Sequence, residues 1–255
     1  MGAQALGNSV HALAKLGYKD DDFMAALVKA ATPRLHDFKP QELSNTVWAL
    51  ATLGHTDDDF VVALIRAATL HLRYFKPQEL ANTVWALATL SHADDAFMAA
   101  LLKTATPQLR DFTPQNLANT VWALATLGHA DGTFMAALLK EATPRLHDFT
   151  PQALTNTVSA LAKLGHTDDD FMAALLKAVT PQLRDFTPQA LANTVWALAT
   201  LGHTDGDFVA ALLKEATPRL RFFNTQEFAN TAWALATLAH ADDDFMAALL
   251  QATTP

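Results

Sequence analysis

The chain has 255 residues and a formal charge of −8, with 26 acidic residues against 18 lysines and arginines. It contains no cysteine, which excludes disulfides, thiolate metal sites and thiol nucleophiles. The negative charge argues at first against a polyanionic ligand, and no apolar run reaches the roughly eighteen residues that a membrane helix needs.

Leu and Ala dominate the composition and β-branched residues other than Thr are sparse, so we expect an all-α fold. A 37-residue repeat organises the sequence, because Pro-Gln recurs at Pro40, Pro77, Pro114, Pro151 and Pro188, with degenerate copies at Ala3-Gln4 and Thr225-Gln226. One such repeat is too small to bury a core alone, so neighbouring repeats must stack. We expect a right-handed α-solenoid that forms a single array over residues 1–255, with repeats at 3–39, 40–76, 77–113, 114–150, 151–187, 188–224 and 225–255. The first repeat follows Met1 and Gly2 directly, without a signal-like segment, so we expect no targeting segment.

The second repeat illustrates the elements in chain order. Its first helix is predicted to begin at Pro40, which suits the first helical position, and to end at Gly54. Three aspartates then cap a second helix that ends near Thr69. In most later repeats a Thr-Pro pair follows, which predicts the N-cap and first residue of a short third helical turn.

The first helix of each repeat has two distinct faces. At 100° per residue, Leu43, Val47 and Leu50 share one face, which predicts the core. A polar and aromatic stripe lies roughly opposite, formed in this repeat by Gln41, Asn45, Trp48 and Thr52, and it recurs along the chain.

Charge is segregated within each repeat. Most acidic residues lie in the turn between the two helices, whereas most basic residues lie late in the second helix or in the connection to the next repeat. Because the first helices begin on that basic edge, the pattern predicts phosphate contacts there. One basic column is Lys29, Arg66, Lys103, Lys140, Lys177 and Lys214. A solvated face with charges that complement the helix dipoles is the alternative explanation.

The segment from Thr187 to His203 resembles the octotricopeptide repeat family and its 37-residue heptatricopeptide relatives. The resemblance covers essentially the whole chain, although the repeat has 37 rather than 38 residues. It implies sequence-specific RNA binding by helical pairs, in an organelle (chloroplast or mitochondrion) or a bacterium. The chain lacks the nuclease-like C-terminal domain of some relatives, so the resemblance implies binding alone.

Two roles fit each of the repeated stripe residues. The five Trp either stack on bases or fill the space between adjacent helices, and the seven Asn either bind base edges or form a ladder between helices. Base discrimination requires positions that vary among repeats: on the first helix these are the third, the fifth, the ninth, where His11 and Ser159 replace Trp, and the thirteenth, where Lys15 and Lys163 replace Thr. Paired change at the ninth and thirteenth positions is typical of a modular one-base-per-repeat reader, although sequence drift also produces it.

We expect no enzyme, no cofactor and no metal site. The six His of the turns are one helix-packing distance apart and do not converge on one ion, and the Asp triplets lack the Gly and Glu of a calcium loop. Turn capping explains both sets.

The sequence thus predicts a monomer that binds single-stranded RNA along the concave face, about one nucleotide per repeat, without a membrane or a small-molecule substrate. The alternatives are a scaffold that holds an extended peptide and a binder of single-stranded DNA. The phosphate candidates are the basic column, and the base-contact candidates are Asn8, His11, Lys15, Ser44, Asn45, Trp48, Asn82, Trp85, Asn116, Asn119, Trp122, Thr155, Asn156, Ser159, Lys163, Asn193, Trp196, Asn230 and Trp233.

Overall fold

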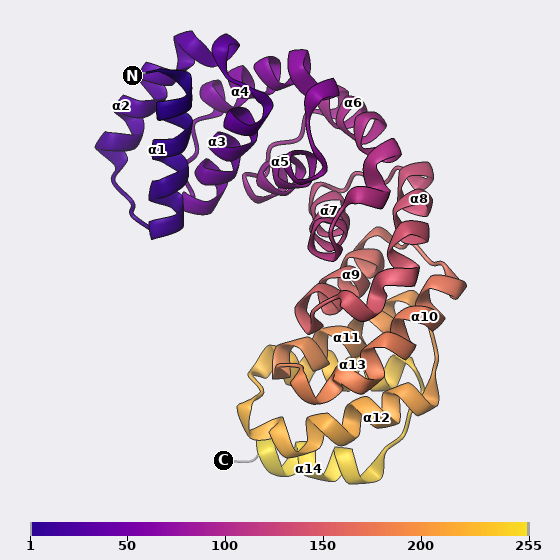
Figure 1. Ribbon diagram of the computed structural model, residues 1–255. Helices are drawn as coiled ribbons and strands as arrows, with labels where there is room; N and C mark the ends of the chain where they lie inside the picture. The colour runs from indigo at the N-terminus through magenta and orange to yellow at the C-terminus, as the bar shows by residue number, and fades with distance from the viewer. Residues whose placement is uncertain (1, 254–255) are drawn as a thin grey trace. The chain divides into compact units, whose positions relative to one another are not determined.

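The computed structural model describes residues 2–253, and every regular element in that range is a helix (Figure 1). Each repeat contributes a first helix, here called the A helix, and a second, the B helix. The A helices are α1 (Ala3–Leu16), α3 (Pro40–Leu53), α5 (Pro77–Thr89), α7 (Pro114–Leu127), α9 (Pro151–Leu164), α11 (Pro188–Leu201) and α13 (Thr225–Thr237). The predicted all-α fold of helix pairs is confirmed.

The B helices are α2 (Asp21–Ala31), α4 (Asp58–His71), α6 (Asp95–Ala105), α8 (Gly132–Ala142), α10 (Asp169–Val179), α12 (Gly206–Ala216) and α14 (Asp243–Thr253). Short 3₁₀ segments follow the first six: η1 (Thr32–Asp37), η2 (Leu72–Tyr74), η3 (Thr106–Asp111), η4 (Thr143–Asp148), η5 (Thr180–Asp185) and η6 (Thr217–Phe222). The third helical turn is therefore present, but its Thr is not an N-cap. The Thr106 hydroxyl donates to the Leu102 carbonyl oxygen at 2.8 Å, so the B helix passes directly into the 3₁₀ segment.

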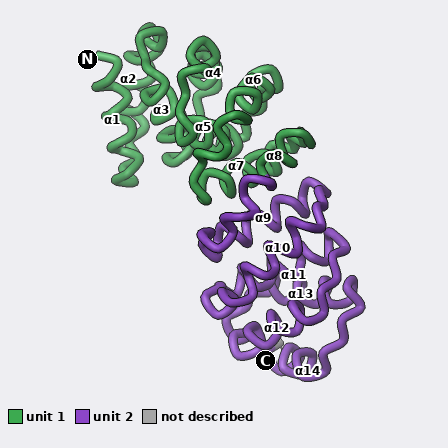
Figure 2. The backbone as a smooth tube through the Cα atoms, turned by 45° about the vertical axis from the view of Figure 1, so that its right-hand side comes forward, with its two compact units in different colours: residues 1–138 green, residues 139–255 purple. Residues whose placement is uncertain are grey.

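The chain divides into two compact units, residues 1–138 and residues 139–255 (Figure 2). In unit 1 the A helices α1, α3, α5 and α7 pack side by side in chain order, and α2, α4 and α6 each pack on the A helix of their own repeat. In unit 2, α9, α11 and α13 pack in the same way, with α10 and α12 on α9 and α11. A single array over the whole chain stays a prediction.

Aspartates start the B helices in the predicted manner. The Asp57 Oδ1 atom accepts a hydrogen bond from the Phe60 N–H at 2.9 Å, and the equivalent bond recurs in all seven repeats. Such a cap satisfies a backbone donor that has no partner within the helix.

Left-handed residues end the A helices. Gly54 has a φ of +67°, and its counterparts Gly17, Gly128, Gly165 and Gly202 have similar values. In repeats 3 and 7 the position is taken by Ser91 and Ala239, which also have positive φ. The predicted glycine stop is confirmed, and two repeats adopt the same turn without glycine.

The core lies between the A and B helices of each unit. Leu80, Val84 and Leu87 of α5 are fully buried, as are Phe97 and Leu101 of α6. The predicted core face of the A helix is confirmed in repeats 2 to 6, including Leu43, Val47 and Leu50. In the first and last repeats, Leu13, Phe228 and Ala232 on this face are half-buried. No helix among the described residues is long and apolar enough to cross a bilayer.

Candidate nucleic-acid interface

The polar stripe occupies the side of the A helices opposite the core. Counting from the first residue of each repeat, its members are the second, sixth, ninth and thirteenth residues. In α5, Gln78 and Thr89 are exposed, and Asn82 and Trp85 are half-buried. The other repeats show the same pattern, except that Asn8 and Trp233, in the first and last A helices, are exposed. The stripe is therefore accessible in each unit.

The sixth-position asparagines have unused hydrogen-bonding groups. Within residues 2–253, no hydrogen bond inside the protein involves the side chain of any of the seven: Asn8, Asn45, Asn82, Asn119, Asn156, Asn193 and Asn230. The alternative of an asparagine ladder between helices is thus absent from the described part of the chain. Each amide has two donors and one acceptor oxygen that face solvent or a ligand.

The ninth-position rings lie partly between neighbouring A helices. His11 of α1 and Trp48 of α3 have ring centroids 5.1 Å apart at an interplanar angle of 49°. Trp233 of α13, with no further A helix beside it among the described residues, is 48% exposed, whereas Trp196 of α11 is half-buried. A following A helix thus covers part of each ring, and the remainder stays on the stripe, so packing and stacking are compatible roles.

Variation at the third position follows helix capping. Where the preceding residue is Thr, as at Thr113, its hydroxyl accepts the N–H of the third residue. Where the preceding residue is Lys39 or Lys76, which offers no acceptor, the third residue is Glu and its carboxylate accepts the lysine backbone N–H at 2.9 Å. In repeats 2 to 6 the third position therefore compensates for the residue before the helix, whereas in repeat 7 Asn224 and Glu227 make both capping bonds. The base-contact candidate Asn116, at this position, is only 8% exposed.

The fifth position packs one A helix against the next. Ser44 is 1% exposed, and its hydroxyl donates to the Glu79 carbonyl oxygen of the next repeat. Thr155 is 5% exposed, and its hydroxyl donates to the Pro151 carbonyl oxygen. A Cβ on Gly7 would lie 3.3 Å from the Glu42 Cβ, so this position is crowded. Ser44, Thr155 and Asn116 are therefore buried, and the proposed interface does not include them.

The ninth and thirteenth positions vary and stay on the surface. In unit 2, Ser159 and Lys163 line a hollow of about 420 Å³ together with Gln189, Asn193, Trp196, Asn224, Gln226, Glu227 and Asn230. The hollow therefore spans the A helices of repeats 5, 6 and 7. The Ser159 Oγ atom is buried in the protein and has no hydrogen-bond partner among the described residues. Sequence reasoning identified five of these nine residues as candidates and missed both glutamines, Asn224 and Glu227, although the glutamines were visible as members of the stripe.

Repeat 1 fills the ninth position differently. Burial lowers the pKa of the His11 imidazole below its ordinary value of 6.5, and the positive charge of Lys15 lowers it further. The His11 Nδ1 atom is buried and has no hydrogen-bond partner within residues 2–253. Neutral His11 is thus favoured on the stripe of unit 1.

The basic column lies on the other side of the helix layers. Lys29, Arg66, Lys103, Lys140, Lys177 and Lys214 are all exposed, and none has a hydrogen bond or ion pair with another described residue. In α6 the buried residues are Phe97, Met98, Leu101, Leu102 and Ala105, which leaves Lys103 on the opposite side of the helix. The column is near the end of each B helix, as predicted, but points away from the A helices instead of lying beside the stripe.

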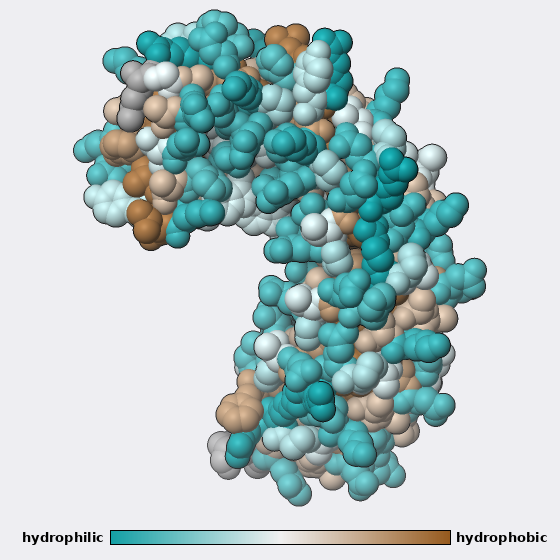
Figure 3. Space-filling view, in the orientation of Figure 1, coloured by the Kyte–Doolittle hydropathy of each residue, from teal (hydrophilic) through white to brown (hydrophobic). Residues whose placement is uncertain are grey.

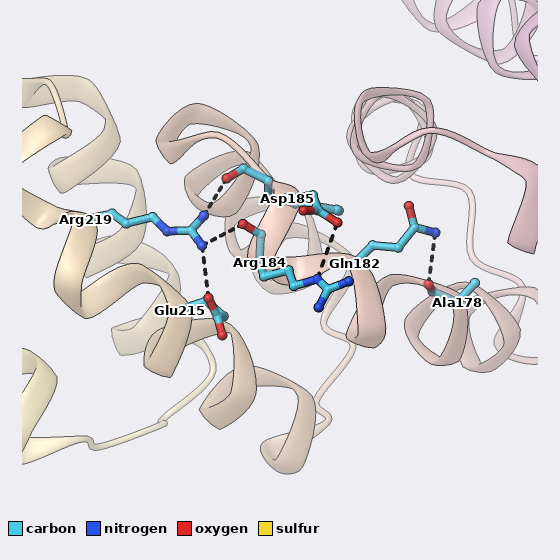
Figure 4. Close-up of polar contacts among 7 residues, drawn as sticks. Ala178, Gln182, Arg184, Asp185, Glu215 and Arg219 are labelled. Carbon is cyan, nitrogen blue, oxygen red and sulfur yellow. Dashed lines mark hydrogen bonds and ion pairs between the residues drawn. The ribbon is translucent and has the colours of Figure 1, made fainter.

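Other basic residues hold neighbouring repeats together. Arg219 Nη1 donates to the Phe186 carbonyl oxygen and Nη2 to the Arg184 carbonyl oxygen, both at 2.7 Å (Figure 4). Its guanidinium also pairs with Glu215 at 3.0 Å. Arg145 has a similar pairing with Glu141, while Arg184 pairs with Asp185 on the surface at 3.7 Å. Part of the basic edge therefore serves the fold.

On the face drawn in Figure 3, polar side chains cover most of the surface and apolar ones form separate patches. Among residues 2–253, no three His, Cys, Asp or Glu side chains group as a metal ion requires.

A family model described as RNA-editing substrate-binding complex 6 protein matches residues 3–243. The chain belongs to this family. The match to the substrate-binding complex 6 family includes α1 to α13 and every residue of the stripe. It agrees with the predicted relation to RNA-associated helical-repeat proteins, and the narrower octotricopeptide assignment stays a prediction. No curated protein matches the chain.

Proposed function

We propose that this protein binds single-stranded RNA along the stripe of its A helices, with about one nucleotide for each repeat. The observation that carries the proposal is the row of sixth-position amides, which are accessible and have no partner in the part of the chain that the structure describes. They lie beside aromatic rings whose free parts are suited to base stacking. The family name, which refers to RNA editing and substrate binding, supports RNA as the ligand.

The proposed contacts to bases are the sixth- and ninth-position residues, together with Lys15 and Lys163. We propose that Lys15 and Lys163, together with the A-helix starts, also bind phosphates, because the basic column of the B helices points away from the stripe. The basic column would contact phosphates only if part of the RNA strand lay off the stripe, on the B-helix side. We further propose that the repeats are of the octotricopeptide type and that one chain acts as a monomer on its RNA, in a single array and without catalysis.

Intrinsic fluorescence tests the proposal, because all five Trp occupy the ninth position. RNA heptamers of random sequence, added in low salt, are expected to quench the emission as bases stack on the free ring faces. Selection from a randomised RNA pool should then give a motif whose unusual letters fall at the places of repeats 1 and 5. Titration with the matching DNA shows whether the ribose 2′-hydroxyl is sensed.

A scaffold for an extended basic peptide is the second candidate, because the net charge of −8 favours a cationic partner. Lack of any response to RNA in low salt, combined with quenching by a lysine-rich peptide, would establish the scaffold and reject RNA binding.

A further inference from the structure

The hollow of unit 2 lies where one repeat lacks its aromatic ring. Repeats 2, 3, 4, 6 and 7 have Trp at the ninth position, whereas repeat 5 has Ser159. Ser159 contributes no ring to the stripe, and the hollow lies between it and Trp196 of the following repeat. The volume of the hollow, about 420 Å³, is within the range of about 300–1,000 Å³ typical of ligand sites.

The lining of the hollow suits a flat heterocycle with polar edges. Trp196 offers an aromatic surface for stacking. Asn193 and Asn230 have half-buried side-chain amides without partners in the described chain. The Ser159 Oγ atom is also unpaired, but it is buried in the protein, so the two amides are the groups within reach of a ligand. A half-buried amide without a partner gains from a ligand that hydrogen-bonds to it. A hydrocarbon ligand would leave all of these groups unsatisfied.

The size of the vacancy selects between base classes. Indole is a fused five- and six-membered ring system, and a purine has the same ring skeleton with nitrogen atoms along its edges. A pyrimidine has a single ring and would leave part of the vacancy empty, which forfeits contact energy. The missing side chain and a purine base are therefore close in shape.

The charges around the hollow suit one phosphodiester. Lys163 is one helical turn beyond Ser159 and exposed, so it can meet a single phosphate. Glu227 is the lining acid, and its Oε2 atom accepts the Asn224 backbone N–H, which fixes that carboxylate beside the hollow. With one lysine and one carboxylate, the hollow has little net charge. It therefore does not favour a free nucleoside triphosphate, which carries several negative charges.

We propose that the hollow formed by Ser159, Asn193, Trp196 and Asn230 binds one purine base of the RNA strand, with its phosphate at Lys163. The proposal rests on the proposed RNA binding and adds that the position facing repeats 5 and 6 prefers a purine.

The test uses the full chain and eight RNA heptamers: oligouridylate and the seven variants that carry a single adenine. One adenine position should bind about tenfold more tightly than oligouridylate, in keeping with base stacking on an aromatic side chain. In Ser159→Trp, which introduces the residue of repeats 2, 3, 4, 6 and 7, the affinity for that heptamer relative to oligouridylate should fall to about one, so the adenine preference vanishes. Ser159→His, with the residue of repeat 1, provides a second way to fill the hollow, and far-ultraviolet circular dichroism checks both folds.

Equal binding of all eight RNAs, or an adenine preference that survives both substitutions, would overturn the purine site while leaving RNA binding intact. If no RNA binds in low salt, the proposed function itself fails. The last measurement is the binding of adenosine monophosphate. If it binds to the parent protein but not to Ser159→Trp, and the RNAs show no adenine preference, the hollow is a site for a free nucleotide. That result would overturn the proposal of a purine within an RNA strand.

Discussion

The sixth-position asparagine is a residue whose binding and folding roles an experiment can separate. Asn82→Ala should weaken RNA binding by about three- to tenfold, the effect of losing one or two neutral hydrogen bonds. The free energy of unfolding should change by less than about 0.5 kcal/mol, because the side chain has no hydrogen-bond partner among the described residues. Fluorescence titration and urea unfolding measure the two quantities.

Lys103→Ala is the matched control for Asn82→Ala, since it removes an exposed polar side chain from the same repeat on the opposite helix layer. It should leave both quantities unchanged. An equal loss of affinity in the two variants would contradict a binding surface on the A helices.

His11 should titrate below 6.5, because burial and the charge of Lys15 both disfavour its protonated form. The unfolded chain then binds a proton near 6.5 while the folded chain does not, so stability is full above 6.5 and falls as the pH drops through the folded-state pKa. Lys15→Gln should raise the pKa of His11 without restoring 6.5, since burial is the larger cause. Nuclear magnetic resonance titration of the imidazole checks both statements, and a pKa above 6.5 in the parent protein would refute them.

At the scale of elements, the connection between repeats depends on Arg219. Arg219→Ala removes two charge-assisted hydrogen bonds to the carbonyl oxygens of the preceding connection. We expect a loss of about 2 kcal/mol in the free energy of unfolding. The control Arg184→Ala breaks only an exposed ion pair and should cost less than about 0.5 kcal/mol. Comparable urea midpoints for the two variants would show that Arg219 does not couple the repeats.

The ends of the A helices give a second pair of variants. Gly202 has a φ of +65°, so Gly202→Ala should lower the free energy of unfolding by about 1–2 kcal/mol. Gly206 is the first residue of α12, has open space around its Cβ position and no positive φ, so Gly206→Ala should be neutral or slightly stabilising. Thermal unfolding measures the stability of the two variants. If Gly206→Ala were the less stable one, backbone strain would not be the reason for glycine at position 202.

At the scale of the molecule, charge placement predicts a weak salt dependence of RNA binding. Seven phosphate contacts would give a slope of log K against log salt of about −5, whereas contacts limited to Lys15, Lys163 and a few helix starts give about −1 to −3. Lys163→Gln should reduce the slope by about 0.7, and Lys177→Gln, on the outward side of α10, should not. A steep slope that becomes shallower in Lys177→Gln would show that the basic column binds phosphates.

The fold followed from the sequence because each of its signals is local. Pro40 starts a helix, Asp57 caps the next and Gly54 ends the first, and each acts within a few residues of itself. The candidate site was predicted less well. Burial of the fifth position depends on how closely two A helices approach, and the hollow at Ser159 depends on three repeats at once. The direction of the basic column depends on which side of the B helix is buried. Counting charges along the sequence does not reveal that side.

The capping exchange at the helix starts bears on any attempt to recombine the repeats. Lys39 closes one repeat in sequence, whereas Glu42, which serves its backbone N–H, belongs to the next. A graft joined at Pro40 that brings in an alanine-type third residue, as in repeats 5 and 6, would separate the partners and leave the junction helix about 1 kcal/mol weaker. Repeats of this chain should therefore be joined one residue before the proline, so that the backbone N–H donor of Lys39 and the carboxylate acceptor of Glu42 stay in the same segment.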